Sequence, residues 1–262
     1  MANLLIGWSD WGDAATIDEV SAETASFEGT QVQATQPTDY WEAVSSTPYI
    51  VFDRGSAQTW NVVAALFTNM ASSDTWRIRT ATSKANLTAS PSLDTGSLTF
   101  RVAGDDDTWD RHHGLYYVSG GRSDRWLRID FSVAGGTLEC GRIIIGNLFQ
   151  PTTNDSYGRA FGPQDPSTKD RTDGGALIAD DKTPFLAAEI NLGFLSEAEA
   201  YGKVFDLFRR RGVRNDVLYI GDPEESTYLM HQIIYGQVAR IRPLSLPQFG
   251  RYEARVLIEE ML

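Results

Sequence analysis

The residues best suited to chemistry lie between positions 105 and 113. Three consecutive aspartates, Asp105 to Asp107, are followed by Asp110 and then by the pair His112 and His113. Carboxylate oxygens are the ligands that calcium prefers, and the ion takes six or more of them. The spacing of an EF-hand loop is absent, so a solvated acidic loop is the preferred interpretation and calcium binding is the alternative.

Other catalytic or metal sites are not indicated. A zinc site needs three or four converging ligands, whereas adjacent histidines usually diverge and the third histidine, His231, lies far along the chain. The single cysteine, Cys140, has no basic neighbour in sequence and is expected to be a small buried hydrophobe. Neither a Gly-x-Ser-x-Gly nor a phosphate-binding Gly-x-x-x-x-Gly-Lys motif occurs. We therefore expect a protein that is not an enzyme and has no cofactor; the less favoured alternative is a cell-wall or polysaccharide hydrolase that uses carboxylates of residues 105–110.

The composition is that of a soluble globular protein with an acidic surface. The 262 residues are 42% hydrophobic, enough for a buried core, and their net charge of -12 disfavours contact with nucleic-acid phosphates. The first residues lack the basic region and the apolar run of a signal peptide, and no stretch approaches the roughly 20 apolar residues that span a bilayer. We expect synthesis in a cytoplasm, no nucleic-acid partner and no membrane span.

Alternating and β-branched runs predict strands through the middle of the chain. Positions 127, 129 and 131 are apolar and alternate with Trp126, Arg128 and Asp130, while three isoleucines stand between Gly141 and Gly146. We expect these two runs to be the last two strands of a β-sandwich. The strands predicted before them, each bounded by turn residues, cover 49–53, 60–67, 75–81, 98–102 and 114–119.

A change of composition after Gln150 predicts a second domain. Residues 155–182 are rich in Gly, Asp, Pro and Thr, and a strand is expected over 183–194. Strand patterns return after position 216 and continue almost to Leu262. The predicted fold is mainly β, with an N-terminal arm and lead-in strands over 1–47, a β-sandwich over 48–150 and a smaller α+β domain over 151–262.

One amphipathic helix is predicted in the C-terminal domain, over about 197–211. Ser196 and Glu199 have the spacing of a capping box, and Gly212 is a typical stop. Arginines 209–211 are expected to compensate the helix dipole, with an anion site as the less favoured alternative. The apolar stripe is expected to comprise Tyr201, Val204, Phe205 and Phe208.

A series of short motifs between residues 48 and 150 resembles the discoidin-like (galactose-binding-like) jelly rolls. In chain order the motifs are Phe52-Asp53-Arg54-Gly55, Trp76-Arg77-Ile78-Arg79, Leu93-Asp94-Thr95-Gly96, Trp126-Leu127-Arg128-Ile129 and Gly141-Arg142-Ile143. They are more similar to the variant seen in tail-associated proteins of bacteriophages. The later pattern of strand, amphipathic helix and Ile220-Gly221-Asp222-Pro223 resembles minor-tail and tail-tip proteins of phages. One cysteine cannot supply the disulfide that closes many discoidin lectins.

The resemblance implies a structural component of a long-tailed phage, at the tail tip or baseplate of the virion. Its partners would be other tail proteins, in a homo-oligomeric ring or a multi-protein assembly. The alternative is an adsorption module that binds glycan on the host surface. Assembly contacts are expected at Trp8, Trp11 and Leu262, and glycan contacts, by stacking and hydrogen bonding, at Trp109, His112, His113 and Arg122.

Overall fold

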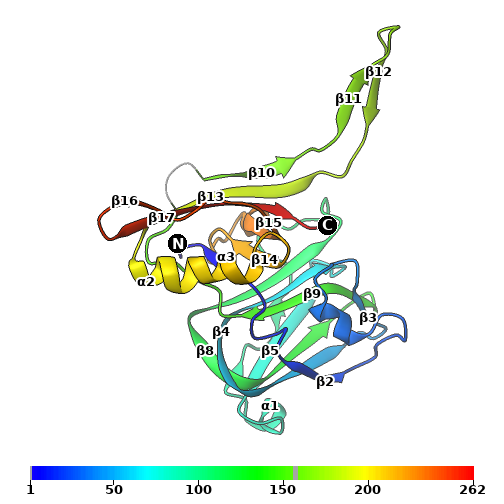
Figure 1. Cartoon of the computed structure of the whole chain (residues 1–262). Coiled ribbons are helices and arrows are strands. Elements are labelled where there is room, and N and C mark those ends of the chain that lie inside the picture. Colours follow the sequence, from blue (N-terminus) through cyan, green and yellow to red (C-terminus); the bar gives the residue numbers. More distant parts are fainter. Residues whose placement is uncertain (1, 156–158) are drawn as a thin grey trace. The chain divides into compact units, whose positions relative to one another are not determined.

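The protein is mainly β and consists of two compact units, shown in Figure 1. The computed structural model describes residues 2–155 and 159–262. The first unit comprises Met1–Gln150 together with Gly221–Met230, and the second comprises Pro151–Ile220 together with His231–Leu262. Among the described residues, no helix is both long and apolar enough to cross a membrane.

The first unit is built from antiparallel strands in the order β3-β9-β4-β8-β5-β6, with β2 paired to β4 and β7 paired to β5. Short helical turns η1 (Gly29–Gln33), α1 (Asn86–Ala89) and η3 (Leu229–Gln232) lie between strands. The strands are β1 (Leu5–Gly7), β2 (Thr16–Val20), β3 (Trp41–Ala43), β4 (Tyr49–Thr68), β5 (Thr75–Ala81), β6 (Leu93–Asp94), β7 (Leu98–Thr99), β8 (His112–Ser132) and β9 (Leu138–Gly146).

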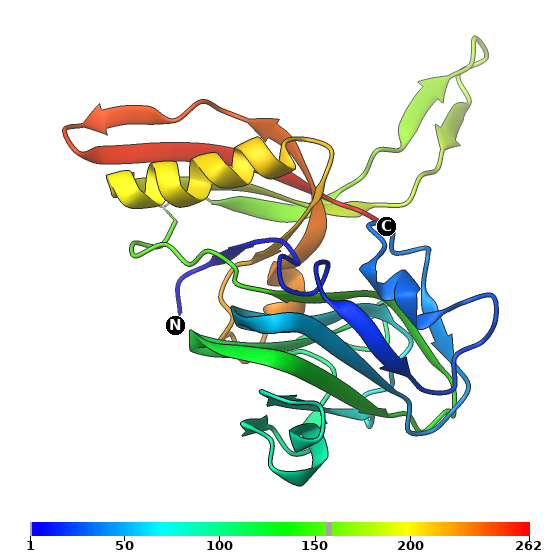
Figure 2. The ribbon, with the colours of Figure 1, turned by 60° about the horizontal axis from the view of Figure 1, so that its bottom comes forward.

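Strands β4 and β8 curve around the core and contribute to both layers of the resulting β-sandwich (Figure 2). The start of β4 pairs with the end of β8, as Tyr49 with Asp130, and the end of β4 pairs with the start of β8, as Thr68 with His112. Register shifts separate the two halves, and Gly120 and Gly121 there adopt φ values of 78° and 71°.

Four of the predicted strands are therefore halves of two long ones. The prediction of separate strands over 49–53 and 60–67, and over 114–119 and 125–131, was wrong because glycines that allow a turn also allow a bulge within a continuing strand. The predicted strand 98–102 is also shorter, since β7 ends at Thr99.

The alternation expected in the second half of β8 is confirmed. Leu127, Ile129 and Phe131 are buried in the main hydrophobic core, where they pack with the buried indoles of Trp41 and Trp76. Strand β9 pairs with β3 and β4, so the end of β4 lies between β8 and β9. The second half of β8 and the isoleucine run of β9 thus share a sheet without being neighbours in it.

The first 47 residues are part of the first unit and contribute to its core. Trp11 is 1% exposed, and its indole N–H donates to the backbone oxygen of Asp124 at 3.4 Å. Trp41 in β3 is fully buried and pairs with Cys140. The prediction of an N-terminal arm was wrong in this respect, because Trp11 and Trp41 are part of the core of the sandwich.

The second unit contains an antiparallel sheet in the order β14-β15-β17-β13-β10, with β16 paired to the first residues of β17. Strands β11 and β12 form a separate two-stranded ribbon inserted between β10 and β13. The strands are β10 (Ala160–Gln164), β11 (Thr168–Arg171), β12 (Leu177–Asp180), β13 (Phe185–Leu195), β14 (Asp216–Ile220), β15 (Ile233–Ile241), β16 (Ser245–Gln248) and β17 (Arg251–Glu260).

The predicted helix is present over residues 197–211, as α2 (Glu197–Glu199), the π-helical turn η2 (Ala200–Val204) and α3 (Phe205–Arg211). Its capping box is confirmed, because the Glu199 backbone N–H donates to Ser196 Oγ at 3.3 Å and the Ser196 N–H donates to the Glu199 carboxylate at 2.9 Å. Gly212 ends the helix with a φ of 56°.

The buried face of this helix differs from the predicted stripe. Ala200, Val204 and Leu207 are buried, whereas Tyr201 and Phe205 are 52% and 51% exposed. The buried residues recur at i, i+4 and i+7, so the helix buries the apolar stripe beside the predicted one and leaves the larger side chains of Tyr201 and Phe205 outside. An apolar surface is therefore left on the outside of the second unit.

Candidate functional site

The loop of residues 103–111, which leads into β8, is held at its base by the buried carboxylate of Asp105. Its Oδ1 lies 2.7 Å from His112 Nδ1, and its Oδ2 accepts the backbone N–H of His113 at 3.2 Å. The side chain of Asp105 is 0% exposed and that of His112 is 10% exposed. The carboxylate therefore joins the two ends of the loop.

Arg101, which sequence reasoning missed, fixes the loop from the other side. Its Nε–H donates to the Met70 oxygen at 2.9 Å, and its Nη1 donates to Asp107 at 2.7 Å. Its Nη2 lies 3.0 Å from His112 Nε2. Because a guanidinium can only donate, His112 Nε2 must accept and His112 Nδ1 must carry the proton that goes to Asp105. A single arginine in a short apolar run gave no signal of this role.

His113 belongs to the core. It is buried, and its Nδ1 accepts the backbone N–H of Phe67 at 3.2 Å while the two rings meet edge to face, with centroids 5.1 Å apart. Burial lowers the pKa of His113 to about 4, so the ring is neutral near pH 7. Neither histidine presents a ring to solvent as expected of a glycan contact, since both are used to shape the loop and the strand beneath it.

The outer part of the loop carries the residues that a ligand can reach. Asp106, Asp107 and Asp110 are exposed, and Trp109 is half-buried. The Asp106 carboxylate accepts the Thr108 backbone N–H at 2.9 Å, and the Trp109 backbone N–H donates to the Asp106 backbone oxygen at 3.3 Å. A turn therefore places a half-buried indole in the same loop as three exposed carboxylates, residue types that suit stacking against a sugar ring and hydrogen bonding to its hydroxyls.

The carboxylates of the loop do not converge on a common point. Asp105 is directed at His112, Asp106 at Thr108, and Asp107 at Arg101. Within the described ranges, no group of three or more His, Cys, Asp or Glu residues is placed to hold a metal ion. The arrangement therefore disfavours the calcium alternative.

Arg122 lies away from this loop. It pairs with Trp60 on β4, whereas His112 pairs with Thr68, eight residues further along β4 and about 25 Å away in an extended strand. Its Nη2 donates to the Ser92 oxygen at 2.8 Å. The four predicted glycan residues are therefore not one site, and only Trp109 keeps the position that the prediction requires.

The predicted assembly residues are also dispersed. Trp11 is a core residue and cannot meet a partner, Trp8 is half-buried, and Leu262 is 53% exposed. Cys140 is fully buried as expected, and burial raises the pKa of its thiol to about 12. A thiol in that state is not a nucleophile near neutral pH.

The anion site, the less favoured alternative for the end of the helix, is not supported by the local contacts. Arg209 and Arg210 both pair with Asp206, at 3.2 and 2.7 Å. Arg211 pairs with the buried carboxylate of Asp216, whose other oxygen accepts the Tyr235 hydroxyl at 3.1 Å. The three guanidinium groups therefore have carboxylate partners within the second unit.

Comparison with known proteins gives a partial likeness in fold. No family model and no curated protein matches the chain. Among solved structures, CBM32-1 from a family 31 glycoside hydrolase of Clostridium perfringens is 13% identical, covering 53% of this chain and 99% of its own, with a TM-score of 0.41. A fucose-binding module of Streptococcus pneumoniae is 10% identical, covering 51% of this chain and 96% of its own, with a TM-score of 0.38. Each of these two likenesses extends over about half of this chain.

Proposed function

We propose that the first unit is a non-catalytic carbohydrate-binding module that stacks a sugar ring on Trp109. The observation that carries this proposal is a half-buried indole in a loop whose base is fixed by two buried groups, Arg101 and Asp105. A loop fixed before binding loses little conformational entropy when the ligand arrives. Aromatic faces and carboxylates supply the stacking and hydrogen bonds that sugar recognition needs.

The charge of the loop narrows the class of glycan. The rim around Trp109 carries the exposed carboxylates of Asp106, Asp107 and Asp110. They accept hydrogen bonds from hydroxyl or ammonium groups and repel anionic sugars. The proposed ligand is therefore a neutral or amino sugar, with uronic and sialic acids disfavoured.

The test is a glycan array probed with the full chain, followed by titration of the best neutral or amino sugar. Trp109→Ala is expected to weaken binding by roughly tenfold or more, the effect of losing about 1.4 kcal/mol of stacking. The matched control is Phe249→Ala, which removes a fully exposed aromatic from the second unit. Absence of adsorption to any neutral or amino sugar, or equal binding by Trp109→Ala, would contradict the proposal.

The non-catalytic part of the proposal rests on the same loop. Asp105, Asp106 and Asp107 each contact a different partner, which supports a binding role over an acid–base pair across one substrate bond. Incubation of the chain with host polysaccharide should release no reducing ends. Release that Asp106→Asn abolishes would show a hydrolase instead.

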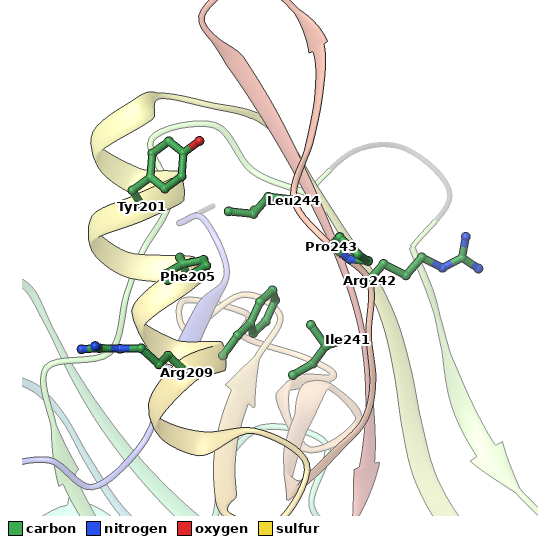
Figure 3. A pocket seen from close by; sticks show the side chains of 8 residues that line it. Tyr201, Phe205, Arg209, Ile241, Arg242, Pro243 and Leu244 are labelled. Atoms are coloured by element: carbon green, nitrogen blue, oxygen red, sulfur yellow. The ribbon is translucent and has the colours of Figure 1, made fainter.

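A second function, as a structural component of a phage tail, is supported by the surface of the second unit. Phe249 is 103% exposed, and Tyr201, Phe205, Leu177 and Ile178 are each more than half exposed. Contiguous exposed apolar side chains mark surfaces that proteins bury in assemblies, and the rings of Tyr201 and Phe205 lie together, with centroids 6.4 Å apart (Figure 3). Mass spectrometry of purified virions from a phage encoding this chain should detect it, and its absence from the particles would exclude this function. The two functions are compatible in one protein.

A further inference from the structure

The imidazole of His112 lies between a buried anion and a buried cation at the base of the 103–111 loop. Its Nδ1–H donates to Asp105 Oδ1 at 2.7 Å, and its Nε2 accepts from Arg101 Nη2 at 3.0 Å. The side chains of Arg101, Asp105 and His112 are 8%, 0% and 10% exposed. The neutral ring therefore connects the two groups that fix the loop.

The neighbouring elements bring no further charge to this ring. From β4, Thr68 donates its hydroxyl to the backbone oxygen of His112 at 3.1 Å. From β9, Glu139 pairs with Arg111, the preceding residue, at 3.3 Å. The following residue, His113, is a buried neighbour whose ring is neutral near pH 7. The charges in contact with the ring, within the part of the chain that the structure describes, are therefore those of one carboxylate and one guanidinium.

Protonation of the ring changes one of these two contacts and keeps the other. The added proton enters at Nε2, because Nδ1 already carries one. Nε2 then has no lone pair for Arg101, and two cationic donors face each other at 3.0 Å in a site that is largely shielded from water. The bond to Asp105 persists and becomes an ion pair. The guanidinium is therefore expected to move away while the base of the loop stays closed.

We propose that His112 is a pH-sensitive switch whose protonation releases Arg101, loosens the outer part of the 103–111 loop and thereby weakens sugar binding at Trp109. The inference rests on the proposed sugar site and adds its regulation. Arg101 Nη1 donates to Asp107 at 2.7 Å, so displacement of the guanidinium is transmitted to the segment that carries Trp109. The module holds its glycan while the ring is neutral and releases it on acidification.

NMR spectroscopy of the full chain without sugar tests the switch directly. The ring signals of His112 report its protonation, and the backbone order parameters of residues 106–110 report the mobility of the loop. As the ring becomes protonated, these order parameters should fall from about 0.85, typical of a rigid backbone, to below about 0.6, typical of a flexible one. Circular dichroism at each pH should show that the protein remains folded.

Three variants separate His112 from other causes of pH dependence. His112→Gln can accept from Arg101 and donate to Asp105 but cannot be protonated, so its loop should stay ordered in acid. Arg101→Ala removes the cation that the protonated ring repels, so its loop should be mobile at every pH. The matched control, His113→Gln, removes the neighbouring titratable ring and should respond to pH like the wild type.

Titration of the best neutral or amino sugar completes the test. Wild-type affinity should fall by roughly tenfold or more when His112 is protonated, and that of His112→Gln by less than about twofold. A loop that is equally ordered in both protonation states, a ring that does not titrate in the folded protein, or loss of the response in His113→Gln would overturn the proposal. If no sugar binds, the proposed function fails, while the order parameters still decide whether the switch operates.

Discussion

His113 Nδ1 accepts a 3.2 Å hydrogen bond from the backbone N–H of Phe67, a residue whose φ of 57° is rare for a side chain of its size. The contact joins the start of β8, which directly follows the 103–111 loop in sequence, to the end of β4. The bond exists only while Nδ1 is unprotonated. The integrity of the loop's base is therefore linked to pH.

We predict that stability falls in mild acid because of His113. Burial lowers its folded-state pKa to about 4, against 6.5 for an ordinary histidine. As the pH falls, His113 is protonated in the unfolded chain before it is protonated in the folded chain. The stability that the neutral ring contributes is therefore complete above pH 6.5 and is lost as the pH falls to about 4. The shift corresponds to about 3 kcal/mol of unfolding free energy. Urea unfolding across that range should show the loss.

The matched comparison is between two histidine substitutions. His113→Gln retains an acceptor for the Phe67 N–H but cannot be protonated, so its unfolding free energy should depend less on pH over that interval. His231→Gln, at an exposed position, should keep the wild-type pH profile. Identical profiles for all three proteins would show that His113 does not control the acid sensitivity.

Removing Arg101 should loosen the proposed sugar-binding loop without removing a group that contacts sugar. Arg101→Ala deletes donors to the Met70 oxygen, Asp107 and His112, and we expect a loss of about 1–3 kcal/mol and faster amide exchange over residues 103–113. Sugar binding should weaken as a consequence. Lys84→Ala, which breaks exposed ion pairs with Asp18 and Glu19 outside the loop, is the control and should leave exchange in the loop unchanged.

Asp13 should matter more to stability than its surface position suggests. Its carboxylate lies 2.8 Å from the guanidinium of Arg142, whose side chain is 0% exposed in β9. Asp13→Ala leaves that charge buried without this partner, and we predict a loss of about 2 kcal/mol, reduced from the fully buried case because Asp13 is partly exposed.

Adding Arg142→Met to Asp13→Ala should cost less than the sum of the two single changes, because the double variant buries no charge at this position. Chemical denaturation of the wild type, the two single variants and the double variant gives the coupling free energy between Asp13 and Arg142. Asp18→Ala removes an exposed partner of Lys84 and should change stability by less than about 0.5 kcal/mol. Additive losses would mean that Asp13 and Arg142 act independently.

The helix of the second unit should depend on its capping box. Ser196→Ala removes the acceptor for the Glu199 backbone N–H and should cost about 1 kcal/mol in thermal or urea unfolding. Ser196→Asp, which restores a capping acceptor, should recover most of that loss. Ser245→Ala, at an exposed position, is the control. If it lowers the unfolding free energy as much as Ser196→Ala does, the effect is a nonspecific one of serine removal.

Local chemistry let the sequence predict several elements by itself. The helix over 197–211 follows from Ser196, Glu199 and Gly212, which act within a few residues of one another. The alternation in the second half of β8 follows from the two-residue period of a strand, which assigns Ile129 to the core and Arg128 to the other face. A mainly β fold follows from the same local signals.

Only the tertiary structure decided which residues gather at the candidate site and which surfaces stay open. Arg101 meets Asp107 and His112 through a fold of the loop that has no sequence period. Gly120 and Gly121 continue a strand instead of ending it, because β4 is present to pair with both halves of β8. The helix offers two adjacent apolar stripes, and burial of Ala200, Val204 and Leu207 leaves Tyr201 and Phe205 facing outward. Such outcomes depend on contacts between distant segments, whose partners a local pattern does not specify.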